Sequence, residues 1–300
     1  MPAFASRLIE ATRARGNPLC AGIDPHLGMI PKLFQRGDMA AGAPETVAAV
    51  RDFSFALLSC LRGKVPVIKP QSAMFERLGP QGMVLMADLC SAAIDDGMMV
   101  IMDAKRGDIG STSAAYADAF LGHHAGFPSD ALTINPFLGM DTLQPFIDKA
   151  AATSSGLFVL VRTSNPGSAD LQGITASDGR PVFHHLADQL RPLVEAAEDE
   201  SGFSSIGIVA GATYPEEAAI LRKLLPSALF LVPGFGAQGG GRDEAFAGFV
   251  DGPEGPEGGV VNASRGISFP SDAADARTEA SWRQAIDHAV NSAITTLSGR

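Results

Sequence analysis

Short hydrophobic runs recur along the chain and alternate with longer amphipathic segments. Runs that are apolar at every position, rather than at every second one, are typical of strands buried on both faces, as in a parallel sheet. Eight runs of this kind predict strands at residues 19–23, 65–69, 98–105, 131–136, 157–163, 205–210, 229–233 and 259–263.

The segments between these runs have the periodicity of helices. Apolar residues spaced three or four positions apart predict amphipathic helices at residues 46–61, 81–94, 181–197, 214–225 and 272–297. A stretch rich in Gly, Pro and acidic residues at 238–258 predicts a long loop around a short helix near 243–249. Strand and helix therefore alternate, which is the pattern of repeated βα units.

Two folds accommodate this pattern: a closed TIM (β/α)8 barrel and an open, doubly wound sheet. Polar residues end nearly every predicted strand, whereas an open sheet would concentrate them near one switch point, so we expect a barrel that forms a single domain over residues 1–300. The polar residues at the strand ends are Asp24, Lys69, Asp103, Lys105, Asn135, Thr163, Ser164, Gln238, Asn262 and Arg265.

The run at 98–102 ends in a row of charged residues. Asp103 and Lys105 are two positions apart and therefore share one face of a strand, and Gly107 allows a turn that places Asp108 beyond it. Buried charges are unfavourable unless they are paired, and Lys69 on the preceding strand lies within reach in a barrel. A structural ion-pair network is the alternative, but the position at the strand ends favours an active site.

The segment from Gly234 to Gly239 matches the pattern GxGxxG. No acidic residue ends an adjacent strand as a dinucleotide site requires, so we interpret the segment as a phosphate-binding loop. Arg265 and Gly266 follow the last strand, and the loops after the seventh and eighth strands commonly bind phosphate in such barrels. An ordinary flexible glycine loop is the alternative.

Composition limits the partners of the chain. A net charge of −10 argues against nucleic acid and anionic membranes, although a few cations in one cleft can bind a small anion. Cys20, Cys60 and Cys90 lie far apart in apolar stretches, which indicates reduced thiols in a cytoplasmic protein. We expect no signal peptide, no membrane helix and, from the spacing of the six histidines, no metal site.

Several motifs, in order along nearly the whole chain, resemble those of the orotidine 5′-phosphate decarboxylase family. They are Cys20–Pro25, Val67–Pro70, the DxKxxD segment Asp103–Thr112, Pro233–Gln238 and Arg265–Gly266. The local sequences TSNP at 163–166 and NASRG at 262–266 resemble the longer type 2, mycobacterial-like branch. Extra length near residues 27–45 and 165–180 departs from the shorter classical enzymes.

The resemblance implies a homodimer that converts orotidine 5′-monophosphate to UMP and carbon dioxide in pyrimidine biosynthesis, without metal or organic cofactor. It implies that Lys105 protonates C6 of the pyrimidine, and that Asp103 faces the substrate carboxylate. The other implied roles are ribose binding by Asp24 and Lys69, sharing of Asp108 and Thr112 with the neighbouring subunit's site, phosphate binding by Gln238 and Arg265, and pyrimidine binding by Ser164 or Thr163.

Two other functions fit the same motifs. One is a phosphosugar aldolase like 3-hexulose-6-phosphate synthase, which requires a divalent metal. The other is a nucleotide-binding barrel without catalytic activity, which the intact set of Asp and Lys residues disfavours.

Overall fold

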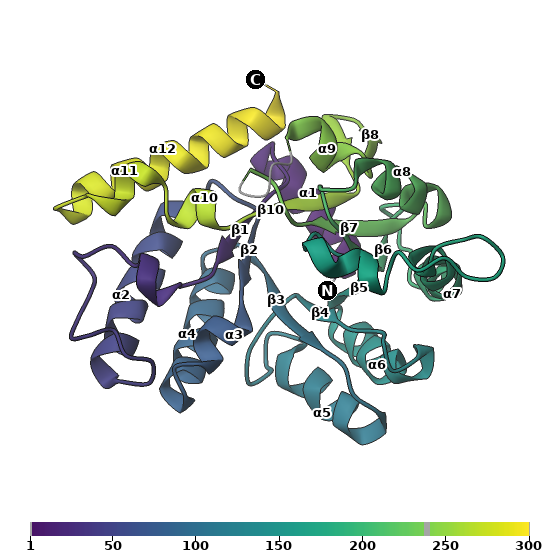
Figure 1. The fold of residues 1–300 in the computed structure, drawn as a ribbon, viewed down its shortest axis with the longest axis horizontal. Coiled ribbons are helices and arrows are strands. Elements are labelled where there is room, and N and C mark those ends of the chain that lie inside the picture. The colour runs from purple at the N-terminus through teal and green to yellow at the C-terminus, as the bar shows by residue number, and fades with distance from the viewer. Residues whose placement is uncertain (1, 237–240, 300) are drawn as a thin grey trace.

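Eight parallel strands close into a barrel, and helices surround it (Figure 1). The computed structural model describes residues 2–236 and 241–299. The barrel strands, in spatial order, are β1 (Leu19–Ile23), β10 (Gly259–Ala263), β7 (Ala228–Val232), β6 (Ser204–Ala210), β5 (Gly156–Arg162), β4 (Ala131–Ile134), β3 (Met99–Arg106) and β2 (Val67–Pro70).

Helices connect the strands and form the outer layer. The α-helices are α1 (Phe4–Arg15), α2 (Pro44–Leu61), α3 (Ser72–Glu76), α4 (Pro80–Asp95), α5 (Gly110–Phe120), α6 (Gln144–Thr153), α7 (Val182–Ala196), α8 (Pro215–Leu224), α9 (Arg242–Phe246), α10 (Arg265–Ser268), α11 (Ser271–Ala274) and α12 (Glu279–Ser298). Short 3₁₀ turns are η1 (Leu27–Met29), η2 (Met140–Leu143) and η3 (Pro166–Asp170).

The closed barrel confirms the expected fold and excludes the open sheet. Cys20 of β1 lies in register with Val67 of β2 on one side and with Asn262 of β10 on the other, so the first and last barrel strands are neighbours. All eight predicted strands are present.

Two predicted segments differ in the structure. The helix predicted at 272–297 is divided into α11 and α12, because Thr278 caps α12 by accepting a hydrogen bond from the backbone N–H of Ser281 at 3.2 Å. The loop predicted at 238–258 contains α9 and an antiparallel hairpin of β8 (Val250–Gly252) and β9 (Gly255–Glu257). Its Gly, Pro and acidic residues carry no alternating apolar pattern, so periodicity could not reveal the hairpin.

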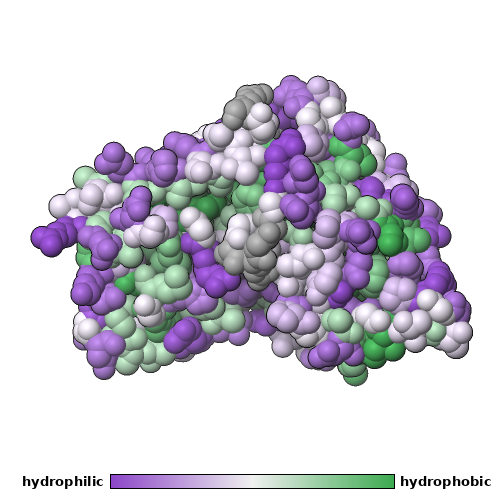
Figure 2. All heavy atoms as spheres, turned by 45° about the horizontal axis from the view of Figure 1, so that its top comes forward, coloured by the Kyte–Doolittle hydropathy of each residue, from purple (hydrophilic) through white to green (hydrophobic). Residues whose placement is uncertain are grey.

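Hydrophobic residues on the face drawn in Figure 2 lie in small groups between hydrophilic ones. Within the part of the chain that the structure describes, we find no helix with the length and apolar character needed to cross a membrane.

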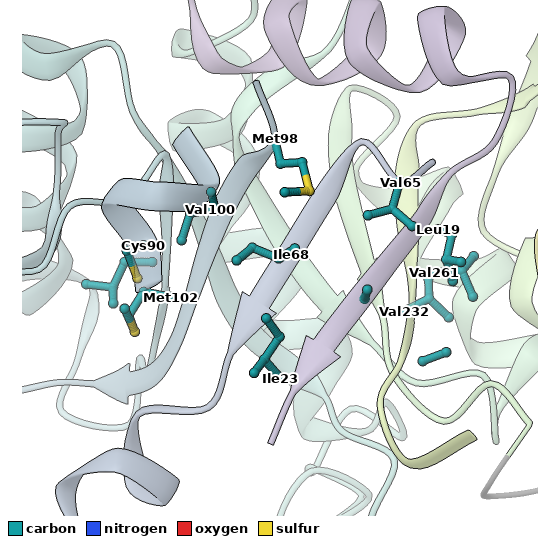
Figure 3. Packing of buried hydrophobic residues seen from close by; sticks show 14 of the residues in the cluster. Leu19, Ile23, Val65, Ile68, Cys90, Met98, Val100, Met102, Val232 and Val261 are labelled. Carbon is teal, nitrogen blue, oxygen red and sulfur yellow. The ribbon is translucent and has the colours of Figure 1, made fainter. Parts of the chain in front are cut away.

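Strand residues point alternately outward and inward, and each direction has its own core. The outward side chains of β1 to β3, among them Leu19, Ile68 and Val100 (Figure 3), share a core cluster with residues of the surrounding helices. The inward side chains form a second core inside the barrel, which includes Val67 and Ile101. The alternation explains why the strands are apolar at every position.

Helix α1 closes the N-terminal end of the barrel. Its residues Phe4, Leu8 and Ile9 are buried and belong to the inner core. The ring of Phe4 meets that of Phe158 edge to face at 6.0 Å between centroids, and it occupies the space that a side chain at Gly156 would need. With this end filled by apolar side chains, the opposite end is where polar groups can gather.

A buried carboxylate anchors α1 to the barrel. Asp130 accepts hydrogen bonds from Arg7 Nη1 at 2.5 Å, from His123 Nε2 at 3.0 Å and from the backbone N–H of Val100 at 2.8 Å. Burial raises the pKa of Asp130, but the hydrogen bonds from His123 and Arg7 and the charge of Arg7 outweigh it, and the pKa lies below its usual value. The same hydrogen bond to Asp130 raises the pKa of His123.

We expect His123 to stabilise the protein in a pH-dependent way. Because its pKa is raised on folding, its contribution is complete below about pH 6.5, the unfolded value, and is lost as the pH rises through the folded value. The loss of unfolding free energy in His123→Leu should therefore be larger at pH 6 than at pH 9, as measured by urea denaturation. The control is His124→Leu, because His124 is exposed and has no polar partner among the described residues. Equal losses at both pH values in His123→Leu would contradict the role of the Asp130 pair.

Candidate active site

The inward side chains change from apolar to polar toward the C-terminal ends of the strands. On four strands, an apolar inward residue is followed two positions later by a polar one. These steps are Val67 to Lys69, Ile101 to Asp103, Ala131 to Thr133 and Val260 to Asn262. The period of two thus carries each strand from the inner core into a polar layer at the open end of the barrel.

Asp103 is the centre of this layer, and the residue is only 6% exposed. Oδ2 accepts hydrogen bonds from Lys69 Nζ at 2.6 Å and from Gln71 Nε2 at 3.1 Å. Oδ1 accepts from Lys105 Nζ at 2.5 Å and from Thr133 Oγ1 at 3.0 Å. One carboxylate therefore joins β2, β3 and β4, and the predicted reach of Lys69 to the row is confirmed.

The ion pairs keep the buried groups charged. Burial raises the pKa of Asp103, but the charges of Lys69 and Lys105 outweigh it and hold the pKa well below its usual value. Burial lowers the pKa of Lys69, but Asp103 and Asp24 outweigh it and raise that pKa. The contribution of Asp103 to stability is therefore present above its ordinary pKa of 3.8 and is lost as the pH falls through the lowered, folded value.

Lys105 departs from regular strand geometry. Its φ is +49°, and the pairing of β3 with β4 shifts register between Met102 and Arg106. Its backbone N–H donates to Thr133 Oγ1 at 2.9 Å. Asp103 and Lys105 meet as the alternation predicts, but a left-handed residue sets their geometry, and such a conformation costs about 1–3 kcal/mol. The strained backbone conformation therefore belongs to the residue whose ammonium is the predicted proton donor.

Gly107 permits a close approach rather than only a turn. A Cβ at this position would lie 2.7 Å from the carbonyl oxygen of Asn135, so no larger residue fits against the end of β4. The chain then reaches Asp108, whose Oδ1 accepts from the backbone N–H of Ile109 at 2.8 Å. Asp108 and the exposed Thr112 do not line the pocket that contains Asp103.

A cavity of about 190 Å³ opens beside Asp103. It brings together the predicted residues Asp24, Lys69, Asp103 and Arg265, which come from β1, β2, β3 and the start of α10. The other lining residues are His26, Gln71, Pro233, Gly234, Phe235, Asn262 and Ser264. The cavity joins Lys69 and Asp103 of the charged row to the loops after β7 and β10, whereas Lys105 is not among its lining residues and Gln238 lies outside the described residues.

Thr163 and Ser164 lie outside this lining. Thr163 is held by Gln172, whose Oε1 accepts from the backbone N–H of Thr163 at 2.9 Å and whose Nε2 donates to its Oγ1 at 3.0 Å. Ser164 packs against Gly211 after β6, where a Cβ would lie 2.9 Å from the Cα of Ser164.

Sequence reasoning missed Gln71 and Thr133 as partners of Asp103. Gln71 lies two positions after Lys69, so strand periodicity could have placed it on the same face. Thr133 is the one polar residue of β4, at an inward position, and this is a recognisable signal. Neither residue is a charged residue at the end of an apolar run, so the pattern that selected Asp103 and Lys105 did not select them.

The fold and this charged layer define a (β/α)8-barrel enzyme with its site at the C-terminal ends of the strands. Residues 18–279 match the family described as Orotidine 5′-phosphate decarboxylase / HUMPS, and the chain belongs to this family.

Named relatives cover nearly the whole chain. It is 40% identical over 293 residues to the orotidine 5′-phosphate decarboxylase of Rhodopirellula baltica. The aligned region covers 95% of this chain and 96% of that protein. It is also 40% identical over 271 residues to the enzyme of the same name from Deinococcus radiodurans, with 89% and 90% covered. The solved structure of Leishmania donovani OMP decarboxylase has a TM-score of 0.73 at 27% identity and covers 99% of this chain and 98% of that one.

We expect Lys69→Met to lower the free energy of unfolding by about 3 kcal/mol, because it leaves the buried Asp103 carboxylate without its buried counter-ion. Lys105→Met is the matched control, since the Lys105 side chain is 46% exposed against 5% for Lys69, and it should lose about 1 kcal/mol or less. Urea denaturation at pH 7 measures both values. Losses of equal size would show that burial does not distinguish the two pairs.

Proposed function

We propose that this protein is an orotidine 5′-phosphate decarboxylase, which converts orotidine 5′-monophosphate to UMP and carbon dioxide in pyrimidine biosynthesis. The observation that carries the proposal is the Asp103 carboxylate, held between Lys69 and Lys105 in a cavity that Arg265 also lines. The names of the full-length relatives support it.

The proposed chemistry depends on Lys105. Loss of carbon dioxide from C6 leaves a carbanion for which the ring has no suitably placed carbonyl. The ammonium of Lys105 stabilises this charge as it develops and then donates a proton to C6, which is electrostatic stabilisation by a positioned group. Asp103 orients that ammonium. It also faces the substrate carboxylate, and two such charges ~4 Å apart repel by about 4 kcal/mol at an effective dielectric of 20.

Two of the remaining proposed substrate contacts are supported by residues that line the cavity. Arg265 makes no ion pair with any described residue, which leaves its guanidinium available for the phosphate, and Gln238 is proposed to bind the same group. Asp24 has a buried Oδ1 without a hydrogen-bond partner among the described residues, which suits a ribose hydroxyl; Lys69 is proposed to bind the ribose with it. Ser164, or Thr163 beside it, is proposed to bind the pyrimidine.

Phosphate binding should also assist the chemical step. Contacts to a group remote from C6 supply binding energy that is used at the reacting carbon. No metal or organic cofactor enters this scheme.

We expect the purified protein to consume orotidine 5′-monophosphate in the presence of EDTA, measured as loss of orotidine absorbance. Lys105→Ala should lower kcat at least about 1,000-fold while leaving the far-ultraviolet circular dichroism unchanged, because it removes both the electrostatic and the proton-donor role. Activity that disappears with EDTA would favour the metal-dependent aldolase instead. Binding of UMP without release of carbon dioxide by the wild-type protein would favour a non-catalytic barrel.

We also propose that the enzyme is a cytoplasmic homodimer of the type 2 branch that binds neither nucleic acid nor membrane. Large apolar side chains are exposed next to Asp108 and after β4: Ile109 is 63%, Phe137 71% and Leu138 52% exposed. An apolar surface beside residues that do not reach their own cavity supports an interface across which Asp108 and Thr112 serve the neighbouring subunit. The extra length near residues 165–180 supports assignment to the longer type 2 branch.

A mixing experiment tests the shared site. Lys105→Ala and Asp108→Ala dimers should each be inactive, but a mixed dimer contains one site with both residues intact. Random exchange of equal amounts should therefore restore about a quarter of wild-type activity, because half of the dimers are mixed and each has one intact site. Absence of recovery after native mass spectrometry confirms exchange would contradict the shared site.

A further inference from the structure

Asn262 of β10 is a buried polar residue of the cavity to which the proposed mechanism gives no role. It is 8% exposed and lines the cavity together with Asp24 and Arg265. Its Nδ2 lies 3.3 Å from Ser264 Oγ, and its Oδ1 is buried without a hydrogen-bond partner among the described residues. A buried polar atom without a partner costs about 1–3 kcal/mol, so a ligand that satisfies it gains that amount.

The surroundings hold this side chain in place. A Cβ at Gly22 of β1 would lie 1.9 Å from Ser264 Oγ, so the glycine makes room for the serine hydroxyl beside Asn262. Ser268 Oγ donates to the backbone carbonyl of Gly22 at 3.0 Å and fixes β1 against the start of α10. One end of the carboxamide is thus engaged by Ser264, and the other end is buried without a partner among the described residues.

The engaged end can be either amide atom. A hydroxyl both donates and accepts, so Ser264 pairs equally with Nδ2 or, after a half-turn of the amide, with Oδ1. The group presented to the cavity is therefore an acceptor in one orientation and a donor in the other, and the ligand decides between them.

The proposed ligand requires the donor. Each ribose hydroxyl carries one hydrogen, and the carboxylate of Asp24 is the acceptor proposed for the ribose. The 5′-phosphate is the group proposed to bind Arg265, and its oxygens at neutral pH only accept hydrogen bonds. Arg265 lies three positions further along, and Gly234 of the phosphate loop lines the same cavity from β7, the strand beside β10.

We propose that Asn262 is a phosphate-binding residue of this site: its amide turns on ligand binding, and Nδ2 donates to the 5′-phosphate beside Arg265. This inference rests on the proposed function. The phosphate would then contact a neutral donor, buried in β10, as well as the exposed guanidinium of Arg265. Ser264 orients the amide of Asn262.

Two substitutions separate a donor from an acceptor. Asn262→Val removes both amide atoms and should weaken UMP binding about tenfold, with little effect on uridine, which lacks the phosphate. Asn262→Asp has nearly the same shape but carries only acceptors and a negative charge, so it should weaken UMP binding about a hundredfold or more. Calorimetry with UMP and ligand-observed NMR with uridine provide the affinities.

Thermal unfolding distinguishes ligand binding from a structural role. Because Asn262→Val removes a buried atom without a partner, the ligand-free variant should unfold at a temperature equal to or above that of the wild type, while UMP should raise this temperature less. Thr46→Val is the matched control: Thr46 is fully buried on α2, lacks a partner for Oγ1 within the described chain and lies outside the cavity, so UMP affinity should not change.

Two results would overturn the inference. One is unchanged UMP affinity in Asn262→Val. The other is a UMP affinity of Asn262→Asp equal to that of Asn262→Val. This result would make Asn262 an acceptor for the sugar. Turnover of orotidine 5′-monophosphate by the wild type, measured alongside, shows in either case whether the proposed function stands by itself. Without wild-type turnover the function fails, and UMP affinities still decide the role of Asn262.

Discussion

The ion pairs of Asp103 are the interaction on which the rest of the site depends. Its carboxylate accepts from Lys69, Gln71, Lys105 and Thr133, which lie on or directly after three neighbouring strands. Such a cluster is favourable only if every charge is paired and hydrogen-bonded, because the barrel interior solvates charges poorly. Parallel pairing of β2 with β3 and of β3 with β4 supplies that geometry, and the cluster in turn positions the ammonium of Lys105.

The two ends of the barrel divide stability from function. At the N-terminal end, α1 fills the interior with apolar side chains, and Asp130 ties it to the strands through Arg7. At the other end, the inward positions become polar and Lys105 adopts a strained backbone conformation. Strain and buried charge are tolerated at a site when the remainder of the fold is well packed.

The cavity also contains polar groups that the protein leaves unsatisfied. Asp24 Oδ1 and Asn262 Oδ1 are both buried without partners within the described chain, on neighbouring strands that face one space. A ligand that pairs with such a group gains the free energy that the unpaired group costs, and at Asn262 we propose that the amide turns to make this pair. The cost of these unpaired groups to the free protein is recovered in the complex.

Local pattern alone determined the eight strands, the parallel barrel and the charged row at Asp103 and Lys105, because apolar period and strand ends are encoded by neighbouring residues. It did not reveal the β8–β9 hairpin, the left-handed Lys105 or the isolation of Thr163 from the cavity. The contact of Thr133 with Asp103 joins residues 30 positions apart. Such contacts depend on the register of paired strands, which only the tertiary structure sets.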